Sequence, residues 1–314
     1  GFDGLWTFET SRDPFLPLLQ IALGTHKINL GPNIAVAFAR SPFSMAMTAW
    51  DIQRVSHGRL LLGLGTQVRA HVERRFSMPF EHPAARISDY IDCMRSIWRT
   101  FQTGGKPDHH GQYYQFTLIN DFFNPGPIDY PNIPIYLAGV NPRMARAAGE
   151  VADGFSIHPM HCPDYVRDVI KPALREGAQI RGRSIEDLVL YADVFIIDGS
   201  TESARMHAEE AVRRQIAFYA STPSYRSFLE YHGKLPIAKK LNLLMREGKL
   251  ADMPYLIDDD LLSAVAISKA DGNIACQLKD RYKDNLIQRV MVYKPIEPNN
   301  EIYWRSFINT LRAP

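Results

Sequence analysis

Two residues able to do acid–base chemistry stand where short apolar runs end. Glu9 follows the run Leu5–Phe8, and His158 follows the run Gly154–Ile157. A carboxylate or an imidazole in such a place can exchange a proton with a bound substrate or hydrogen-bond a cofactor. For Glu9, a solvated loop carboxylate and a cap for a helix starting near Pro14 remain open alternatives.

Small residues end three further apolar runs and suit close approach of a ligand to the backbone. Gly139, Val140 and Asn141 lead into a helix, whose free N–H groups and dipole favour an anion, so we expect a phosphate there. Thr66 and Gln67 follow a Gly-Leu-Gly sequence, which alone is a weak signal for a phosphate or ring edge. The small residues of 31–40 admit a flat ring, or they merely satisfy strand packing.

Composition limits the classes of partner. The chain has 36 Lys+Arg against 34 Asp+Glu and a net charge of +2, which gives no reason to expect a nucleic acid or a membrane. No apolar run approaches the roughly 20 residues of a spanning helix. The three cysteines are far apart, which fits the cytoplasm. His158, His161 and Cys162 lack a second ligand group at zinc-like spacing, so no metal is expected.

Short apolar runs alternate with amphipathic helical patterns, and this alternation predicts parallel strands joined by helices. Seven strands are predicted, at 5–8, 28–37, 59–65, 133–139, 154–158, 188–197 and 289–293. Helices are predicted at 41–55, 84–100, 143–151, 201–219 and 300–311, and near Asp258–Asp260. A closed (β/α)₈ barrel needs eight strands, so the first strand is expected to be missing from the numbered chain. We predict one domain over residues 1–314, with a helical insertion at about 219–288 before the last strand.

Several motifs resemble the bacterial luciferase-like family of (β/α)₈ TIM barrels. They are GFDGLW, INLGPNIAVAFARSP, TAWDIQRVSHGRLLLGLG, PAARISDYIDCMRSIW and IPIYLAGVNPRMARAAGEVADGF, in this order from residue 1. The segments GTQVRAHVERRFSMPFEHPAAR, RQIAFYASTPSYR and LIDDDLLSAVAI are similar to a subgroup of oxidoreductases that use the deazaflavin coenzyme F-420. The family also contains FMN-dependent monooxygenases.

The resemblance implies which residues bind the cofactor. Asn33, Ile34, Ala35 and Val36 should line the ring, Thr66 and Gln67 should contact its edge or the ribityl chain, and Gly139, Val140 and Asn141 should hold the phosphate. A non-prolyl cis peptide bond, typical of the F-420 branch, is expected at Asn33–Ile34 or within the next two residues. The family further implies a homodimer formed through the helices Pro42–Val55 and Ala84–Thr100.

The sequence also departs from the family. The sugar-phosphate dehydrogenase branch has Asp-His where Glu9-Thr10 stands and Gly-Thr-Gly-Glu where 65–68 reads Gly-Thr-Gln-Val, so sugar-phosphate oxidation is not expected. Glu9 and His158 remain as candidate catalytic residues. Apolar and aromatic residues suggest an apolar ketone, alcohol or enone as substrate; they are Trp6, Phe8, Phe38, Phe76, Phe80 and Tyr113.

The leading hypothesis is therefore hydride transfer between coenzyme F-420 and a small organic molecule. An FMN-dependent monooxygenase, served by a separate flavin reductase, is the first alternative. A barrel protein that only binds a ligand or partner is the second. Cofactor binding distinguishes the three.

Overall fold

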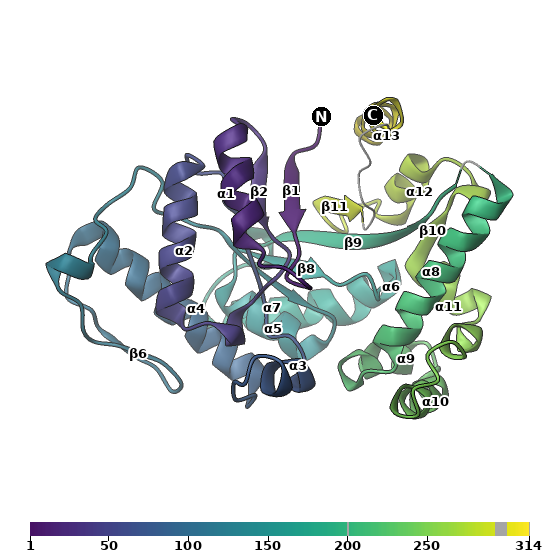
Figure 1. Cartoon of the computed structure of the whole chain (residues 1–314), viewed down its shortest axis with the longest axis horizontal. Helices are drawn as coiled ribbons and strands as arrows, with labels where there is room; N and C mark the ends of the chain where they lie inside the picture. The colour runs from purple at the N-terminus through teal and green to yellow at the C-terminus, as the bar shows by residue number, and fades with distance from the viewer. Residues whose placement is uncertain (200, 293–299, 314) are drawn as a thin grey trace.

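The computed structural model describes residues 1–199, 201–292 and 300–313, which form an α/β fold of parallel strands with helices outside them (Figure 1). The strands are β1 Gly4–Thr7, β2 Asn29–Pro32, β3 Ala35–Val36, β4 Leu62–Gly65, β5 His109–His110, β6 Gln115–Phe116, β7 Ile135–Gly139, β8 Gly154–Ile157, β9 Val189–Ile197, β10 Ala266–Ser268 and β11 Arg289–Val292. The helices are α1 Phe15–Gly24, α2 Pro42–Val55, α3 Arg69–Arg74, α4 Pro83–Thr103, α5 Pro142–Val151, α6 Pro163–Tyr165, α7 Lys171–Ile180, α8 Glu202–Ala220, α9 Arg226–Tyr231, α10 Leu235–Arg246, α11 Asp259–Val265, α12 Ile274–Arg281 and α13 Glu301–Arg312.

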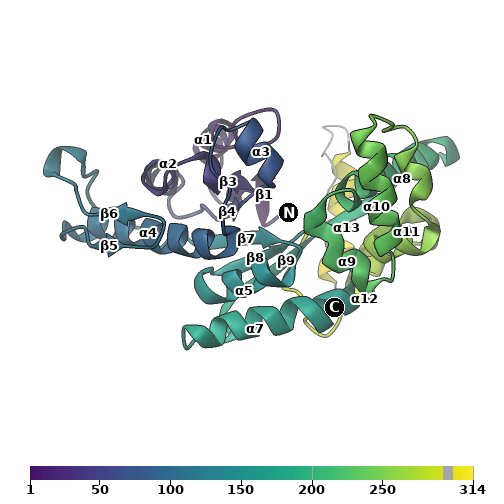
Figure 2. The ribbon, with the colours of Figure 1, turned by 90° about the horizontal axis from the view of Figure 1, so that it is seen from below.

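The parallel strands follow one another in chain order, as in a (β/α)₈ barrel. β1 pairs with β2, a bridge between Leu30 and Leu60 links β2 to the approach of β4, and the sheet continues as β3–β4–β7–β8–β9–β10, with β11 also on β9. Helices α1 and α2 flank one end of this array and α8 to α11 the other (Figure 1), while α5 and α7 pack together along a third side (Figure 2). Within the described residues no ladder joins β1 to β11, so the array is open there.

All seven predicted strands are present, with three corrections. The run at 28–37 is divided into β2 and β3, because the chain leaves the ladder at Asn33 and Ile34. The predicted insertion contains helices α9 to α12, but it also contains β10, which pairs with β9 and is too short for a period-two pattern. The hairpin β5–β6 was not predicted. Of the last run, Tyr293 lies outside the described residues.

The predicted helix starts are confirmed by their caps. Side-chain oxygens of Ser41, Asn141 and Asp258 accept hydrogen bonds from the backbone three residues further on, at the starts of α2, α5 and α11. The apolar stripe predicted at 84–100 faces inward on α4 and belongs to the chain's own core. No helix in the described part of the chain is long and apolar enough to cross a membrane.

Two glycines explain how β2 and β4 approach so closely. A Cβ atom on Gly63 would lie 2.1 Å from the carbonyl oxygen of Pro32, and one on Gly31 would lie 1.9 Å from that of Leu61. No side chain fits at either position. These glycines therefore serve strand packing, which is the simpler of the two interpretations offered for this region.

Candidate active site

The predicted site residues gather at one edge of the sheet. Val36 of β3 is in register with Gly65 of β4, and Gly139 of β7 is in register with Ile157 of β8. The residues that follow these parallel strands consequently lie at their shared carboxyl end, where barrels of this kind place their chemistry. The structure thus brings Asn33–Val36, Thr66–Gln67, Gly139–Asn141 and His158 to the same side.

The segment Asn33–Val36 passes over the end of β4. The Asn33–Ile34 peptide bond is cis, as expected. Ile34 lies against Gly65, where a Cβ atom would stand 2.8 Å from Ile34 Cδ1. The side chains of Ala35 and Val36 are 0% exposed, whereas Ile34 is half-buried. A ring at this edge would therefore meet the Ile34 side chain and the backbone, and not the other side chains.

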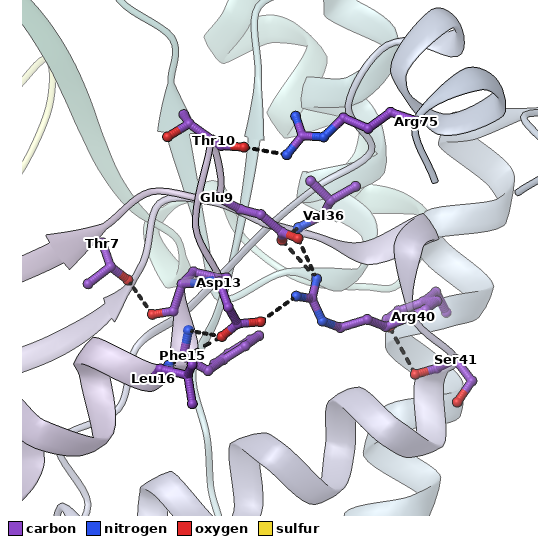
Figure 3. A network of polar contacts seen from close by, with 12 residues as sticks. Thr7, Glu9, Thr10, Asp13, Phe15, Leu16, Val36, Arg40, Ser41 and Arg75 are labelled. Carbon is purple, nitrogen blue, oxygen red and sulfur yellow. Dashed lines mark hydrogen bonds and ion pairs between the residues drawn. The ribbon is translucent and has the colours of Figure 1, made fainter. Parts of the chain in front are cut away.

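Glu9 is engaged in a partly buried ion pair (Figure 3). Its Oε2 accepts a hydrogen bond from the Val36 N–H at 2.7 Å, and Arg40 donates to both of its oxygens at 2.9 and 2.8 Å. Burial acts to lower the pKa of Arg40, but Glu9 and Asp13 outweigh it and the pKa is raised. Asp13 also caps α1 by accepting from Phe15 N. Glu9 is therefore neither a solvated loop carboxylate nor the helix cap.

Thr66 and Gln67 turn the chain sharply after β4. Gln67 has a left-handed backbone with φ of 57°, and its side-chain oxygen accepts from the Val68 N–H at 3.0 Å. The Thr66 hydroxyl donates to the Gln67 carbonyl at 3.2 Å. Both side chains are half-buried. Hydrogen bonds within the turn therefore hold both side chains, beside the neighbouring Asn33–Val36 segment.

The turn before α5 offers backbone donors. The Asn141 side chain is already used, because it accepts from the Met144 N–H at 3.0 Å, and the Val140 carbonyl accepts from the Tyr165 hydroxyl at 3.0 Å. By contrast, the N–H groups of Val140 and Asn141 have no acceptor within the described residues. A phosphate oxygen fits this donor set at a helix start.

His158 stands among tyrosines beside this turn. Its Nδ1 accepts from the Met160 N–H at 3.2 Å, which leaves the ring proton on Nε2, 3.1 Å from the Tyr225 hydroxyl. Tyr219 packs edge-on at 4.5 Å between ring centroids. Burial and the neighbouring His161 lower the pKa of His158 to about 3, so the ring is neutral at pH 7. Tyr219 and Tyr225 come from the end of α8 and the segment after it, which was predicted as an insertion.

Sequence reasoning missed a polar cluster inside the strand array. Asp193 of β9 is 6% exposed and accepts from Asn33 Nδ2 at 3.0 Å, and burial raises the pKa of Asp193 to about 8. Ser156 and Tyr191 both donate to Asn33 Oδ1 at 3.1 Å. The available signal was one carboxylate in the otherwise uncharged strand Val189–Ile197.

The aromatic residues expected to form one substrate pocket are dispersed. Trp6 stacks on Tyr191 inside the array, with 5.2 Å between ring centroids. Phe38 is 1% exposed and packs on Phe80, whereas Phe8 is 43% exposed. Trp6 and Phe38 thus belong to different clusters of the core, and the apolar substrate inferred from these aromatic residues stays a prediction. In the described part of the chain, no three His, Cys, Asp or Glu side chains are grouped to hold a metal ion.

Comparison with known proteins places the chain in a family. The family described as luciferase-like monooxygenase matches residues 1–289, so the chain belongs to the luciferase-like family and is an oxidoreductase. An uncharacterized protein of Mycobacterium tuberculosis is 42% identical over 291 residues, covering 93% of this chain and 85% of its own length. The 5,10-methylenetetrahydromethanopterin reductase of Archaeoglobus fulgidus is 27% identical, covering 96% of this chain and 88% of its own.

Solved structures share the fold. The coenzyme F-420-dependent tetrahydromethanopterin reductase of Methanopyrus kandleri superimposes with a TM-score of 0.76 at 23% identity, covering 99% of this chain and 89% of that one. An F-420-dependent secondary alcohol dehydrogenase, solved with an F-420–acetone adduct, gives a TM-score of 0.75 at 17% identity, covering 100% of this chain and 91% of that one. The TIM-barrel fold of the luciferase-like type is thereby confirmed.

Proposed function

We propose that this enzyme transfers a hydride between coenzyme F-420 and a small organic substrate. The observation that carries the proposal is the single edge that collects Asn33–Val36, Thr66–Gln67, Gly139–Asn141 and His158. Support comes from the reductase relative and from the F-420-dependent enzymes that share the fold.

The residues at this edge fit the parts of the cofactor. In the proposal, the backbone of Asn33–Val36 and the Ile34 side chain support the ring, and Thr66 and Gln67 contact its edge or the ribityl chain. The free N–H groups of Val140 and Asn141 receive the phosphate, at the helix start that follows Gly139. Glu9 holds the Val36 N–H in place and thereby orients the ring-binding segment.

The bound deazaflavin supplies two-electron hydride chemistry, and the protein supplies positioning and a proton path. His158 is neutral and keeps its proton on Nε2, against the Tyr225 hydroxyl. We infer that the Tyr225 hydroxyl exchanges a proton with the substrate's oxygen or alkene carbon, and that the Nε2–H of His158 stabilises the tyrosinate by donating a hydrogen bond to it. Since both oxygens of Glu9 are bound to Arg40, Glu9 is proposed to position and not to transfer a proton.

The proposed substrate is a carbonyl compound, its alcohol, or an enone. Each accepts or gives a hydride at carbon and a proton at a neighbouring atom, which is what one hydride site and one His–Tyr pair can provide. The fold neighbour solved with an F-420–acetone adduct is a secondary alcohol dehydrogenase, which supports this class.

FMN is the second candidate cofactor, because fold neighbours include monooxygenases such as that from Streptomyces bottropensis, at a TM-score of 0.61. In that case a separate flavin reductase would supply reduced FMN.

Titration of the protein with F-420 and with FMN, followed by fluorescence and thermal unfolding, tests the choice. A cofactor present at 100 times its Kd should stabilise the fold by about 2.7 kcal/mol. Tight binding of FMN with flavin-dependent oxygen uptake would overturn the F-420 proposal. Stabilisation by neither cofactor would favour a barrel that only binds a ligand or partner.

Replacing Tyr225 with Phe tests the proton path. If the pair moves the proton, Tyr225→Phe should lower kcat about 10²-fold or more while the Kd for F-420 stays within threefold. Tyr231→Phe is the matched control, since its hydroxyl bonds to exposed Asp168 and lies outside the site. Equal effects of the two substitutions would refute the role of Tyr225.

A further inference from the structure

The side chain of Asn33 is fixed inside the strand array by partners from three other strands. Its Oδ1 accepts hydrogen bonds from Ser156 of β8 and Tyr191 of β9, each at 3.1 Å. Its Nδ2 donates to Asp193 of β9, at 3.0 Å from Oδ2 and 3.3 Å from Oδ1. Met291 of β11 adds a sulfur at 3.7 Å from the same nitrogen.

Both ends of the Asn33 amide are hydrogen-bonded. Two hydroxyl groups donate to the amide oxygen, and the carboxyl group accepts from the amide nitrogen. These contacts to two neighbouring strands hold the Asn33 side chain in place.

The oxygen and the nitrogen of the Asn33 amide differ in how well they tolerate the loss of a hydrogen-bond partner. Ser156 and Tyr191 share one acceptor, so either hydroxyl can be lost while the other remains. The amide nitrogen donates to the oxygens of Asp193, and its other contact is the weakly accepting thioether sulfur of Met291. Loss of the Asp193 oxygens would leave a buried N–H group poorly satisfied, which is costly.

The Asp193 carboxyl group satisfies the Asn33 amide, but its burial counts against the stability of the fold. Asp193 is 6% exposed, in a strand whose other members are uncharged, and burying such a group is unfavourable. What it contacts is the first residue of the segment that forms the proposed ring support. Asn33 is joined directly to Ile34, which lies against Gly65, so a held Asn33 side chain restrains the start of this segment.

We propose that Asp193 is a positioning residue that holds the Asn33–Val36 segment, and with it the deazaflavin ring, through its hydrogen bond with the Asn33 amide. The proposal rests on the proposed function for the ring, but the effect on the segment is independent of the cofactor. Asp193 touches no reacting atom and acts only through Asn33.

Three variants test this. Asp193→Leu removes the acceptor, and Asp193→Asn keeps an acceptor oxygen of the same reach. Leu190→Ala truncates a buried residue of the same strand, three positions from Asp193 and therefore on the other face of the strand. Fluorescence titration with F-420 should give a Kd raised tenfold or more for Asp193→Leu, and within threefold of wild type for Asp193→Asn and Leu190→Ala. The expected thermal destabilisation of Leu190→Ala separates loss of stability from loss of positioning.

Hydrogen–deuterium exchange without cofactor provides the second measurement. Peptides that cover 33–36 should exchange faster in Asp193→Leu than in wild type, Asp193→Asn or Leu190→Ala, while peptides of β7 stay unchanged. Unchanged exchange at 33–36, or a Kd for F-420 that Asp193→Leu shares with wild type, overturns the proposal. If wild type binds no F-420 but Asp193→Leu still exchanges faster than wild type at 33–36, the proposed cofactor is refuted and the role of Asp193 in holding the segment is retained.

Discussion

Loss of the ion pair between Glu9 and Arg40 should lower both the stability of the fold and the affinity for the cofactor. The Glu9 side chain is 6% exposed and that of Arg40 is 22% exposed, so water compensates poorly when one partner is lost. We predict that Glu9→Gln lowers the free energy of unfolding by about 2 kcal/mol. It should also raise the Kd for F-420, because the Val36 N–H loses a charged acceptor. Urea unfolding and fluorescence titration measure the two effects.

Glu73→Gln is the matched control for this substitution. Glu73 pairs with Arg69 at 2.6 Å on the surface of α3, where both side chains are well exposed. Such pairs contribute about 0–1 kcal/mol. If Glu9→Gln instead abolishes turnover while stability and cofactor binding are unchanged, Glu9 is a proton-transfer group and our assignment of it as a positioning residue is wrong.

Asp193 should make the stability of the fold depend on pH. Burial raises the pKa of Asp193 from 3.8 to about 8, so the folded state binds a proton that the unfolded state releases between these values. Stability is therefore unaffected below about pH 4, falls by about 1.4 kcal/mol for each pH unit up to about 8, and then levels off. Asp193→Asn carries no such group. The stability of Asp193→Asn relative to wild type should consequently grow from pH 5 to pH 8, as measured by denaturant unfolding.

Parallel stability curves for wild type and Asp193→Asn over this range would show that folding does not raise the pKa of Asp193. Leu190→Ala of the same strand serves as a control, because it changes no ionisable group and its difference from wild type should stay constant over the same interval.

How far the sequence reveals the site differs from residue to residue. The cis peptide bond after Asn33 was predicted from a family resemblance and is confirmed. The partner of Glu9 lies 31 residues away in Arg40, and no spacing rule joins a loop after one strand to a residue after the next. Asp193 was not predicted as a site residue, because a buried strand is recognised in a sequence by its apolar residues. Its meaning depends on Asn33, 160 residues earlier.

Close packing of β2 on β4 should make Gly63 intolerant of even one methyl group. Gly63→Ala would place Cβ 2.1 Å from the Pro32 carbonyl oxygen, and backbone cannot yield as a flexible side chain can. We predict destabilisation by roughly 1–3 kcal/mol, as for other overpacked sites. The substitution should also weaken F-420 binding, since Asn33 directly follows the displaced strand.

Gly24→Ala is the control, because no atom lies within 4 Å of its added Cβ. The unfolding midpoint of Gly24→Ala should equal that of wild type or be slightly higher. Equal midpoints for Gly63→Ala and wild type would contradict the close approach.

Strands and helices with strong patterns were predictable, and the short elements were not. The helix predicted at 84–100 has apolar residues at helical spacing. In the structure it spans Pro83–Thr103, close to the prediction. β10 has three residues and is held by pairing with Phe195–Ile197 of β9, a contact that no local pattern contains. The same limit applies to Tyr219 and Tyr225: their segment was recognised as helical, but its return to His158 is a tertiary contact.

The surface of the molecule suggests where a second copy would bind. α4 was expected to contribute to a dimer, but its apolar stripe is buried in the chain's own core. α1 differs, because it has no charged residue and exposes Leu16 by 73%, Leu19 by 41% and Leu23 by 67%. Met47 of the adjacent α2 is 43% exposed. We propose that the homodimer expected for this protein forms through α1 and α2.

Charged substitutions on α1 test this arrangement. In a two-fold dimer the same face is used twice, so the double substitution Leu16→Glu and Leu23→Glu would bring four carboxylates into one apolar contact. We predict that the double variant is a monomer by sedimentation at concentrations where wild type is a dimer, with unchanged secondary structure. Leu243→Glu on α10 is the control, because Leu243 is 56% exposed and α10 lies well away from α1 in both views (Figures 1 and 2). A wild-type monomer, or a double variant that remains dimeric, would exclude the α1–α2 face.

α1 follows the loop that holds Glu9 and Asp13, so a dimer through this face would also stabilise the ion pair with Arg40. In that case F-420 affinity should fall with dimer dissociation on dilution.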